Sequence, residues 1–190
     1  MDALKFAIGD EDELNISLIR NMLQSKGHII SCEENDGPSL LRKIRSIIPD
    51  FVIVGYNIQG MKGAEIARIV QGDRIAPVLL IAESSQDIFI REMGNENFAY
   101  IIKPISEIQL LGTIEYVYNN FKRLVNLENE VSELKEMLET RKTVERAKGI
   151  LIDKYTMKEK DAFRYIQKRS MDECKPILDI AKRIIENSKK

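Results

Sequence analysis

The sequence of 190 residues predicts an α/β domain with a parallel sheet, followed by a long helix and a small all-helical domain. Up to about residue 110, short apolar runs alternate with amphipathic stretches, which is typical of strands and helices that alternate along a chain. From residue 107 to Gly149, only Gly112 interrupts a stretch without glycine or proline, so a helix can continue beyond the last helix of the α/β domain. The remaining residues are again amphipathic, and they are strongly basic.

Short segments, several of them apolar throughout, are expected to form a sheet that helices cover on both faces. They are Lys5–Ile8, Ile29–Glu33, Phe51–Val54, Val78–Ala82 and Tyr100–Ile102. Between the first two, a helix is expected over Leu14–Ser25, with an apolar face of Leu14, Leu18, Ile19, Met22 and Leu23. Residues 1–120 are therefore predicted to form a flavodoxin-like domain with a five-stranded parallel sheet, whose functional surface lies at the carboxyl ends of the strands.

A hydrophobic seam is expected on the linker helix that follows, at residues 121–139. Its apolar residues recur at alternating steps of three and four, which is the a/d pattern of a coiled coil. They are Leu124, Leu127, Val131, Leu134 and Leu138. We expect a homodimer through this coiled coil; a helix packed on its own domain is the alternative.

Residues 140–190 are expected to form three helices, at Arg141–Lys154, Lys158–Arg169 and Pro176–Glu186. Their inward residues are expected to be Val144, Ala147, Leu151 and Tyr155, then Ala162, Phe163 and Ile166, then Ile177, Ile180, Ala181 and Ile184. This segment carries 15 Lys and Arg against 8 Asp and Glu, a net charge of +7, and the preceding residues carry 14 against 22, a net of −8. The basic segment is a candidate for a phosphate-bearing partner, although a merely solvated basic face is the alternative.

Composition also excludes several classes of function. No apolar run reaches the ~18 residues of a membrane-spanning helix, and the N-terminus lacks a signal-peptide pattern, so we expect a cytoplasmic protein. The single histidine, His28, is expected on the surface just before a strand, which argues against zinc binding and histidine-based catalysis. Cys32 and Cys174 are expected to be free thiols.

Motifs in residues 1–120 resemble those of receiver domains in two-component response regulators. After the first strand, Asp10 and Glu11 stand at the positions that hold Mg²⁺ in that family, and Lys103, followed by Pro104, matches its lysine after the fifth strand. The stretch Pro49–Gly63 matches the third-strand motif, with Gly55 at the phosphoacceptor position. Ala82 stands where the family has Thr or Ser.

These departures imply a pseudo-receiver, because glycine cannot accept a phosphoryl group. The lost carboxylate also removes a metal ligand, so no metal or cofactor is expected beyond weak Mg²⁺ binding by Asp10 and Glu11. An acidic cluster of Asp10, Glu11 and Asp12 remains beside Lys103. A salt bridge that fixes the loops and a docking surface for a sensor protein are both open interpretations.

The C-terminal segment resembles the ANTAR domain of transcription antitermination regulators. The resemblance rests on Leu138–Leu151, which contains Ala147-Lys148-Gly149, and on Asp161–Ile166, Lys168–Asp172 and Leu178–Ala181. It departs at Ile152, where methionine is usual, and at Lys158, where a small hydroxyl usually caps the second helix; Thr156 is expected to cap instead. The resemblance implies RNA contacts by Arg141, Ala147, Lys148, Gly149, Arg164, Lys168 and Arg169.

Gly149 costs about 1 kcal/mol relative to alanine inside a helix, so a reason for it is expected. Two explanations for this glycine remain open: close approach by a ligand or another backbone, and tight helix–helix packing. Together, the two resemblances imply an RNA-binding antitermination regulator that binds tandem stem-loops of leader RNA as a dimer. A protein-interaction module held by a sensor partner is the alternative, and a DNA-binding response regulator ranks below both. No enzymatic role is expected, because the catalytic-type constellation is interrupted at Gly55.

Overall fold

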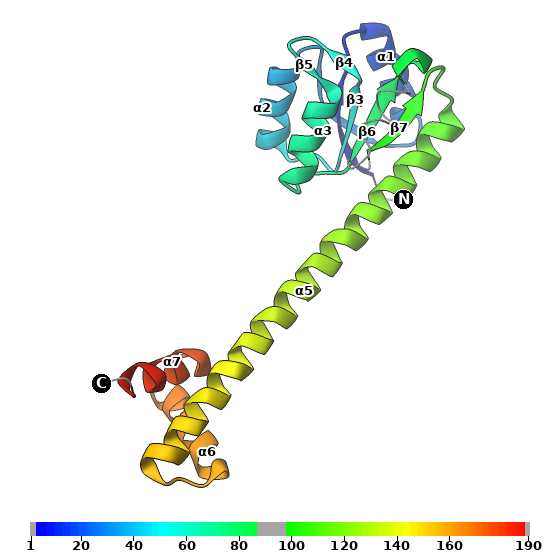
Figure 1. Ribbon diagram of the computed structural model, residues 1–190. Helices are drawn as coiled ribbons and strands as arrows, with labels where there is room; N and C mark the ends of the chain where they lie inside the picture. The colour runs from blue at the N-terminus through cyan, green and yellow to red at the C-terminus, as the bar shows by residue number, and fades with distance from the viewer. Residues whose placement is uncertain (1–2, 87–97, 189–190) are drawn as a thin grey trace. The chain divides into compact units, whose positions relative to one another are not determined.

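The computed structural model describes residues 3–86 and 98–188. The chain divides into two compact units, Met1–Val125 and Asn126–Lys190, which we call the receiver unit and the C-terminal unit. Helix α5 (Glu107–Tyr155) begins in the first unit and ends in the second (Figure 1). Within the described residues, no helix is long and apolar enough to cross a membrane.

The receiver unit is built on a parallel five-stranded sheet with the order β2-β1-β3-β6-β7. Its strands are β1 (Lys5–Gly9), β2 (Ile29–Glu34), β3 (Phe51–Gly55), β6 (Val78–Ala82) and β7 (Ala99–Ile102). Each lies within one residue of the predicted range. The order is that of the flavodoxin-like fold, so the predicted fold class is confirmed.

Helices cover both faces of this sheet (Figure 1). One core packs α1 (Glu13–Gln24) and the first turns of α5 against Phe6, Ile8, Phe51 and Ile53. The other packs α2 (Gly37–Ile47) and α3 (Gly63–Gly72) against the alternate side chains, such as Val52 and Val54. A small hairpin of β4 (Asn57–Ile58) and β5 (Met61–Lys62) lies between β3 and α3 in the chain, and a 3-10 turn spans Ser84–Gln86.

Two expectations about the receiver unit were wrong. The buried face of α1 consists of Ile16, Ile19 and Leu23, whereas Leu14 and Leu18 are 78% and 43% exposed. The stripe of residues 14, 18 and 22 and the stripe of residues 16, 19 and 23 both fit helical spacing, so periodicity alone did not fix the rotation of the helix. His28 is buried rather than superficial, and its Nδ1 accepts a hydrogen bond from the Leu4 backbone at 3.3 Å. Desolvation by this burial lowers the pKa of His28.

The C-terminal unit packs α6 (Glu159–Asp172) and α7 (Ile177–Asn187) against the last turns of α5. The helix expected to begin at Arg141 is not separate, because α5 runs without a break through the expected boundary between residues 139 and 140. The core of the unit consists of Val144, Ala147, Leu151, Ala162, Ile166, Ile180 and Ala181. Tyr155 and Phe163, which were expected inside, are 65% and 38% exposed.

The ends of the last two helices also differ from expectation. Lys158 occupies the N-cap of α6 without a side-chain hydrogen bond, and Thr156 adopts a positive φ of 53° in the preceding turn instead of capping the helix. Pro176 is the N-cap of α7 rather than a residue of its first turn. Glu173 follows the last residue of α6 and forms ion pairs with Arg169, Lys175 and Arg183. It therefore links the two helices.

Candidate functional site

The carboxyl ends of the parallel strands gather the residues that resemble a receiver site. Asp10 directly follows β1, Gly55 ends β3, Ala82 ends β6 and Lys103 directly follows β7. The register pairs Gly9 with Val54, Gly55 with Ile81 and Ala82 with Ile102, so these positions lie at one edge of the sheet. The structure thus brings together the four positions that the sequence singled out.

Asp10 is almost completely buried, with 2% of its surface exposed. Its Oδ1 accepts hydrogen bonds from the backbone N–H of Asp12 at 2.9 Å and from Nδ2 of Asn15 at 3.2 Å. Its Oδ2 has no hydrogen-bond partner, which makes it the one buried side-chain polar atom of the described residues without one. Such a group carries a desolvation cost that nothing in the surrounding protein offsets.

Gly55 explains why this carboxylate can lie where it does. A Cβ atom added at Gly55 would come within 2.5 Å of Oδ2 and 2.9 Å of Cγ of Asp10. The Asp10 carboxylate therefore occupies space that any side chain at position 55 would need. The phosphoacceptor position has lost its side chain, and its neighbour has filled the volume.

Lys103 does not replace the missing interactions. Its side chain is half-buried, and residues 3–86 and 98–188 contain no ion pair between Lys103 and Asp10 or Glu11. The salt bridge, one of the two open interpretations of this cluster, is thus not formed. The Lys103–Pro104 peptide is cis, and Ala82 offers no hydroxyl group.

The residues at this edge do not fit a Mg²⁺ site of the receiver type. Among the residues that the structure describes, no three His, Cys, Asp or Glu side chains form a group that could hold a metal ion. Asp10 offers one unpartnered side-chain oxygen, and Gly55 has no side-chain oxygen. Mg²⁺, in contrast, requires near-octahedral coordination by oxygen.

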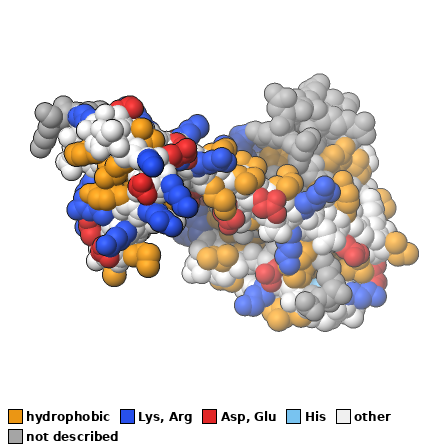
Figure 2. All heavy atoms as spheres, turned by 90° about the horizontal axis from the view of Figure 1, so that it is seen from below, with side chains coloured by type: hydrophobic (Ala, Val, Ile, Leu, Met, Phe, Trp, Pro, Cys, Tyr) orange, Lys and Arg blue, Asp and Glu red, His pale blue; other side chains and the backbone are white. Residues whose placement is uncertain are grey.

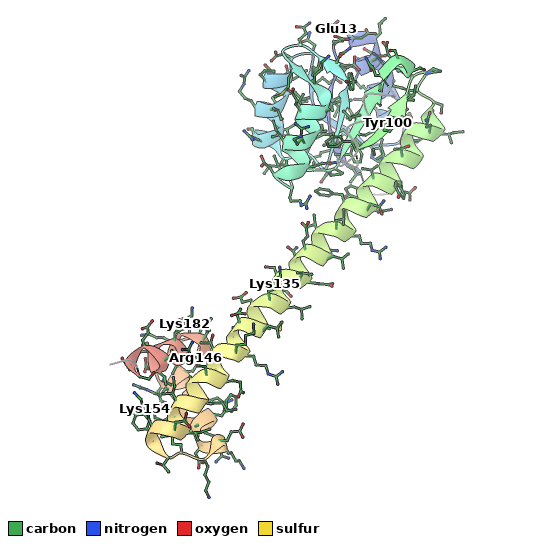
Figure 3. The ribbon with its side chains drawn as sticks, viewed as in Figure 1. Glu13, Tyr100, Lys135, Arg146, Lys154 and Lys182 are labelled. Carbon is green, nitrogen blue, oxygen red and sulfur yellow. The ribbon has the colours of Figure 1, made fainter. Side chains whose placement is uncertain are left out.

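The second candidate site is the basic C-terminal unit. Lys and Arg side chains gather on its visible face, interspersed with a few Asp and Glu (Figure 2, left). Of the residues expected to contact RNA, Arg141, Arg164, Lys168 and Arg169 are exposed. Arg146 and Lys154 on α5 and Lys182 on α7 add to these charges (Figure 3).

Two expected RNA contacts lie inside the unit instead. Ala147 is fully buried in the core, so its role is packing. Lys148 is 8% exposed, and its Nζ forms ion pairs with Glu145 at 3.0 Å and Glu159 at 2.9 Å. The hydrogen bonds that Lys148 donates to Glu159 and Glu145 raise the pKa of Lys148, and the bond from Lys148 lowers the pKa of Glu159. Lys148 thus joins α5 to α6 and is not available to a phosphate.

Outside the neighbouring turns of its own helix, Gly149 has no close neighbour among residues 3–86 and 98–188. A Cβ atom added there would meet nothing within 4 Å. Tight helix–helix packing within the chain was therefore the wrong interpretation of this glycine. Approach by a second chain or by a ligand stays as a prediction.

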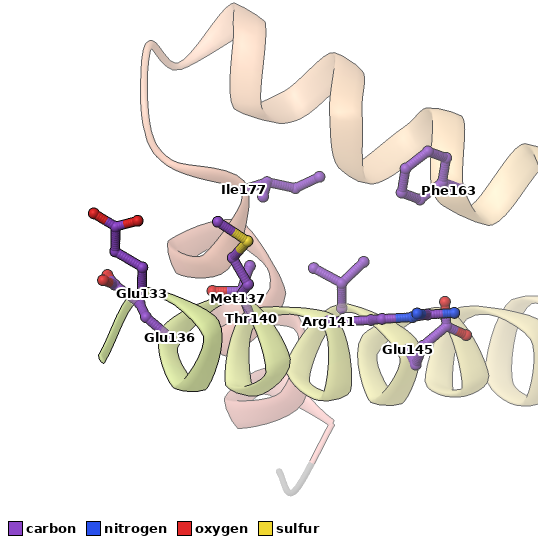
Figure 4. Close-up of a pocket in the computed structure, with 9 residues that line it drawn as sticks. Glu133, Glu136, Met137, Thr140, Arg141, Glu145, Phe163 and Ile177 are labelled. Atoms are coloured by element: carbon purple, nitrogen blue, oxygen red, sulfur yellow. The ribbon is translucent and has the colours of Figure 1, made fainter. Parts of the chain in front are cut away.

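A groove of about 600 Å³ runs between α5 and the α6–α7 pair (Figure 4). Met137, Val144, Phe163 and Ile177 line it, and Arg141 also faces it. Three carboxylates, of Glu133, Glu136 and Glu145, border the same groove. Because these acids outnumber the one cation, the groove is poorly suited to a phosphate backbone.

The seam of α5 is about half exposed among the residues that the structure describes. Leu124, Leu127, Val131, Leu134 and Leu138 are between 46% and 58% exposed. The alternative of a linker helix packed on its own domain is therefore wrong. A contiguous apolar stripe in solvent marks an interaction surface.

This fold and these sites define a response regulator: a receiver domain followed by a helical output domain. Residues 6–115 match the model of the response regulator receiver domain family, and residues 132–185 match that of the ANTAR domain family. The transcriptional regulatory protein PdtaR of Mycobacterium tuberculosis is 37% identical over 178 residues, which cover 93% of this chain and 87% of that protein. The chain belongs to the family of response regulators that combine a receiver domain with an ANTAR domain.

Other relatives match the receiver unit alone. The chemotaxis protein CheY of Pseudomonas aeruginosa is 29% identical over 119 residues, 60% of this chain and 96% of that protein. The signal receiver domain of a modulated diguanylate cyclase from Desulfovibrio desulfuricans G20 has the same fold, with a TM-score of 0.59 and 21% identity over 64% of this chain and 98% of that chain. Together the matches identify a transcription regulator of the ANTAR class, and the two matched domain families are regulatory rather than enzymatic.

Proposed function

We propose that this protein is an RNA-binding transcription antitermination regulator that binds tandem stem-loops of nascent leader RNA in the cytoplasm. The observation that carries the proposal is the row of exposed cations on α6, Arg164, Lys168 and Arg169, within the unit that matches the ANTAR domain. These side chains can contact the phosphates of an RNA loop, and Arg guanidinium groups can also stack on its unpaired bases.

Dimerisation through the seam of α5 is part of the proposal. Two copies of the C-terminal unit would present two binding surfaces to two stem-loops on one RNA. Binding of the first loop then raises the effective concentration of the second, so a tandem RNA binds more tightly than a single hairpin. The unpartnered leucines of the seam support this arrangement.

We further propose that the receiver unit works without phosphorylation and without a required Mg²⁺ ion. Gly55 provides no acceptor oxygen, and the Asp10 carboxylate fills the space of an acceptor side chain. Control of the protein would then come through a bound partner, through the dimer or through its amount. No catalytic role is assigned to any residue.

The test is a mobility-shift titration of the full chain with a pool of tandem stem-loop RNAs that carry randomised loops. Replacing Arg164, Lys168 and Arg169 together by alanine should weaken binding by at least 10-fold and flatten its salt dependence by about two to three counterions. A matched control removes three cations of the receiver unit, Lys5, Arg42 and Arg45, and should leave binding unchanged. Equal loss in both variants, or tighter binding to duplex DNA than to RNA, would overturn the assignment.

A second candidate function is a protein-interaction module held by a sensor partner. The observation that favours it is the exposure of Leu14 and Leu18 on α1, next to the exposed Glu11. An exposed apolar pair beside an acidic loop is suited to a protein surface with complementary charge. Affinity capture with the variant Glu11→Ala, Leu14→Ser, Leu18→Ser would test it: a partner captured by the native chain and lost by the variant supports this function.

A further inference from the structure

A small pocket lies where the ends of α5 and α7 meet α6 in the C-terminal unit. Its volume is about 160 Å³. Side chains of the core, such as Leu151 and Ile184, line its apolar part. Tyr155 of α5 and Tyr165 of α6 border it as well. None of these residues belongs to the set of contacts that the resemblance implied.

The two tyrosines are exposed aromatic side chains rather than core residues. Tyr155 is 65% exposed and Tyr165 is 37% exposed. Exposed aromatic side chains are costly to leave in water without a partner, and two of them at one cavity provide a flat apolar lining. The pocket therefore has the shape and chemistry that accept a planar aromatic ring.

The charged residues of the pocket are all cationic. The Arg169 guanidinium lies 5.8 Å from the centre of the Tyr165 ring, and its Nη1 approaches the Tyr165 hydroxyl at 3.4 Å. Lys154 Nζ donates a hydrogen bond to the Ser188 carbonyl at 2.5 Å, which holds the ammonium group at the rim. The exposed Asn187 side chain completes the rim with an amide, a group that can hydrogen-bond to the edge of a base.

The larger groove beside Met137 and Phe163 differs from this pocket in the charge of the residues that line it. Three glutamates border that groove, whereas no acidic residue lines the pocket of Tyr155 and Tyr165. Glu173 does pair with Arg169 at 3.3 Å, but from outside the lining. The phosphates that flank a bound nucleotide would thus find Lys154 and Arg169 as the charged residues of the pocket lining.

From these observations we infer that the pocket receives one unpaired RNA base, stacked on Tyr155 and Tyr165, with its flanking phosphates beside Lys154 and Arg169. Bases in hairpin loops are unstacked and available for stacking on aromatic and guanidinium planes. The inference rests on the proposed function, which it deepens by assigning the base-binding position. It also adds Lys154, Tyr155, Tyr165 and Asn187 to the interface.

The test measures fluorescence anisotropy of the full-length chain with an RNA selected by the native protein from the tandem stem-loop pool. Tyr155→Ala and Tyr165→Ala should each weaken binding by about 5- to 150-fold, whereas Tyr165→Phe keeps the ring and should bind within about 2-fold of the native chain. Tyr116→Ala is the matched control, since Tyr116 is 69% exposed and lies in the receiver unit. Circular dichroism of each variant verifies folding, and Tyr165→Leu replaces Tyr165→Ala if the latter unfolds.

An abasic substitution identifies the base itself. At the loop position that enters the pocket, the abasic RNA should bind the native chain as weakly as Tyr155→Ala binds the intact RNA, and the two losses should not add. If the native chain selects no RNA, the proposed function fails. If it selects RNA that every tyrosine variant binds equally well, only the pocket assignment fails. A change in the sedimentation coefficient of Tyr155→Ala would assign the pocket to a second copy of the chain and would likewise overturn it.

Discussion

At the scale of single residues, Gly55 and Asp10 compete for one small volume at the carboxyl end of the sheet. The buried carboxylate is held there by two hydrogen bonds to Oδ1, while Oδ2 faces the backbone of Gly55 without a partner. Restoring an acceptor side chain would therefore demand more than one substitution. Asp10 would have to leave its present position.

Gly55→Ala tests this competition. It should destabilise the receiver unit by about 1–3 kcal/mol, because the added Cβ forces Asp10 to move and break its hydrogen bonds. Asp10→Gly in the same chain should recover most of the loss. Urea unfolding measures the change in the free energy of unfolding. Gly112→Ala is the control, since a Cβ atom at residue 112 meets nothing within 4 Å. This substitution should stabilise α5 by about 1 kcal/mol. An unchanged unfolding midpoint in Gly55→Ala would show that Asp10 relaxes freely.

Lys148 is the residue whose role the structure changed most. Lys148→Met keeps the apolar stem in the core but leaves Glu145 and Glu159 unpaired, so it should lower the thermal midpoint of the C-terminal unit. Lys142→Met, on the same helix, removes only an exposed pair with Glu139 and should have a smaller effect. RNA affinity of the folded protein should hardly change, in contrast to the α6 variant.

The effect of Lys148→Met should depend on pH. The lowered pKa of Glu159 means that its contribution is present above the ordinary carboxyl pKa of about 4.3 and is lost as pH falls through the folded pKa. The raised pKa of Lys148 means that its contribution is present below the ordinary pKa of about 10.4 and is lost above the folded pKa. Thermal unfolding at pH 7 should separate native and variant chains, and the gap should shrink at pH 3. A constant gap would mean that packing, not charge, is responsible.

At the scale of secondary-structure elements, α5 carries both an exposed seam and part of a core. Leu134→Glu should convert the dimer to a monomer, because it places a charge at the centre of the apolar stripe. Sedimentation equilibrium measures this. Ile108→Glu is the control: Ile108 is 89% exposed on the same helix but lies outside the seam, so the dimer should persist. If both substitutions changed the oligomeric state equally, the seam would not be the dimer interface.

The secondary-structure elements differ in how accurately the sequence predicts them, because their local sequence patterns differ. The strands could be predicted to within a residue, because several of them are short apolar runs bounded by Gly, Pro or polar residues. The face of α1 could not, since two stripes satisfied the same periodicity. The continuity of α5 through residue 140 was missed because the family resemblance suggested a domain boundary, although no Gly or Pro breaks the helix there.

For the two candidate sites, too, the sequence predicts some features and not others. The four positions at the sheet edge follow from strand order, so Gly55 and Ala82 could be identified from sequence motifs. That Asp10 fills the volume beside Gly55 depends on side-chain packing between two strands, which no pattern reveals. Lys148 pairs with Glu159, eleven positions later and on another helix, so its burial was hidden as well. The one missed signal was the pairing of aromatic and basic residues at Lys154-Tyr155 and at Tyr165 with Arg169.

At the scale of the whole molecule, the two units carry opposite charge and separate tasks. The receiver unit carries 13 Lys and Arg against 17 Asp and Glu, a net charge of −4, and the C-terminal unit carries 16 against 13, a net charge of +3. An anionic RNA is therefore attracted to the C-terminal unit and repelled by the receiver unit. The receiver unit has kept the fold of its family, with Gly55 at the position that matches the family's phosphoacceptor. We therefore expect the C-terminal unit to recognise RNA in every state of the receiver unit.

The most direct test of the central claim is the affinity of the unphosphorylated full-length chain for tandem and single stem-loop RNAs of the selected sequence, measured by anisotropy at fixed salt. The account predicts binding without any phosphodonor, and tandem RNA bound about 10²- to 10⁴-fold more tightly than a single hairpin. Leu134→Glu should abolish that preference while retaining the weaker affinity for the single hairpin. Absence of RNA binding at low salt, or equal affinity for both RNAs, would contradict a dimeric RNA-binding regulator.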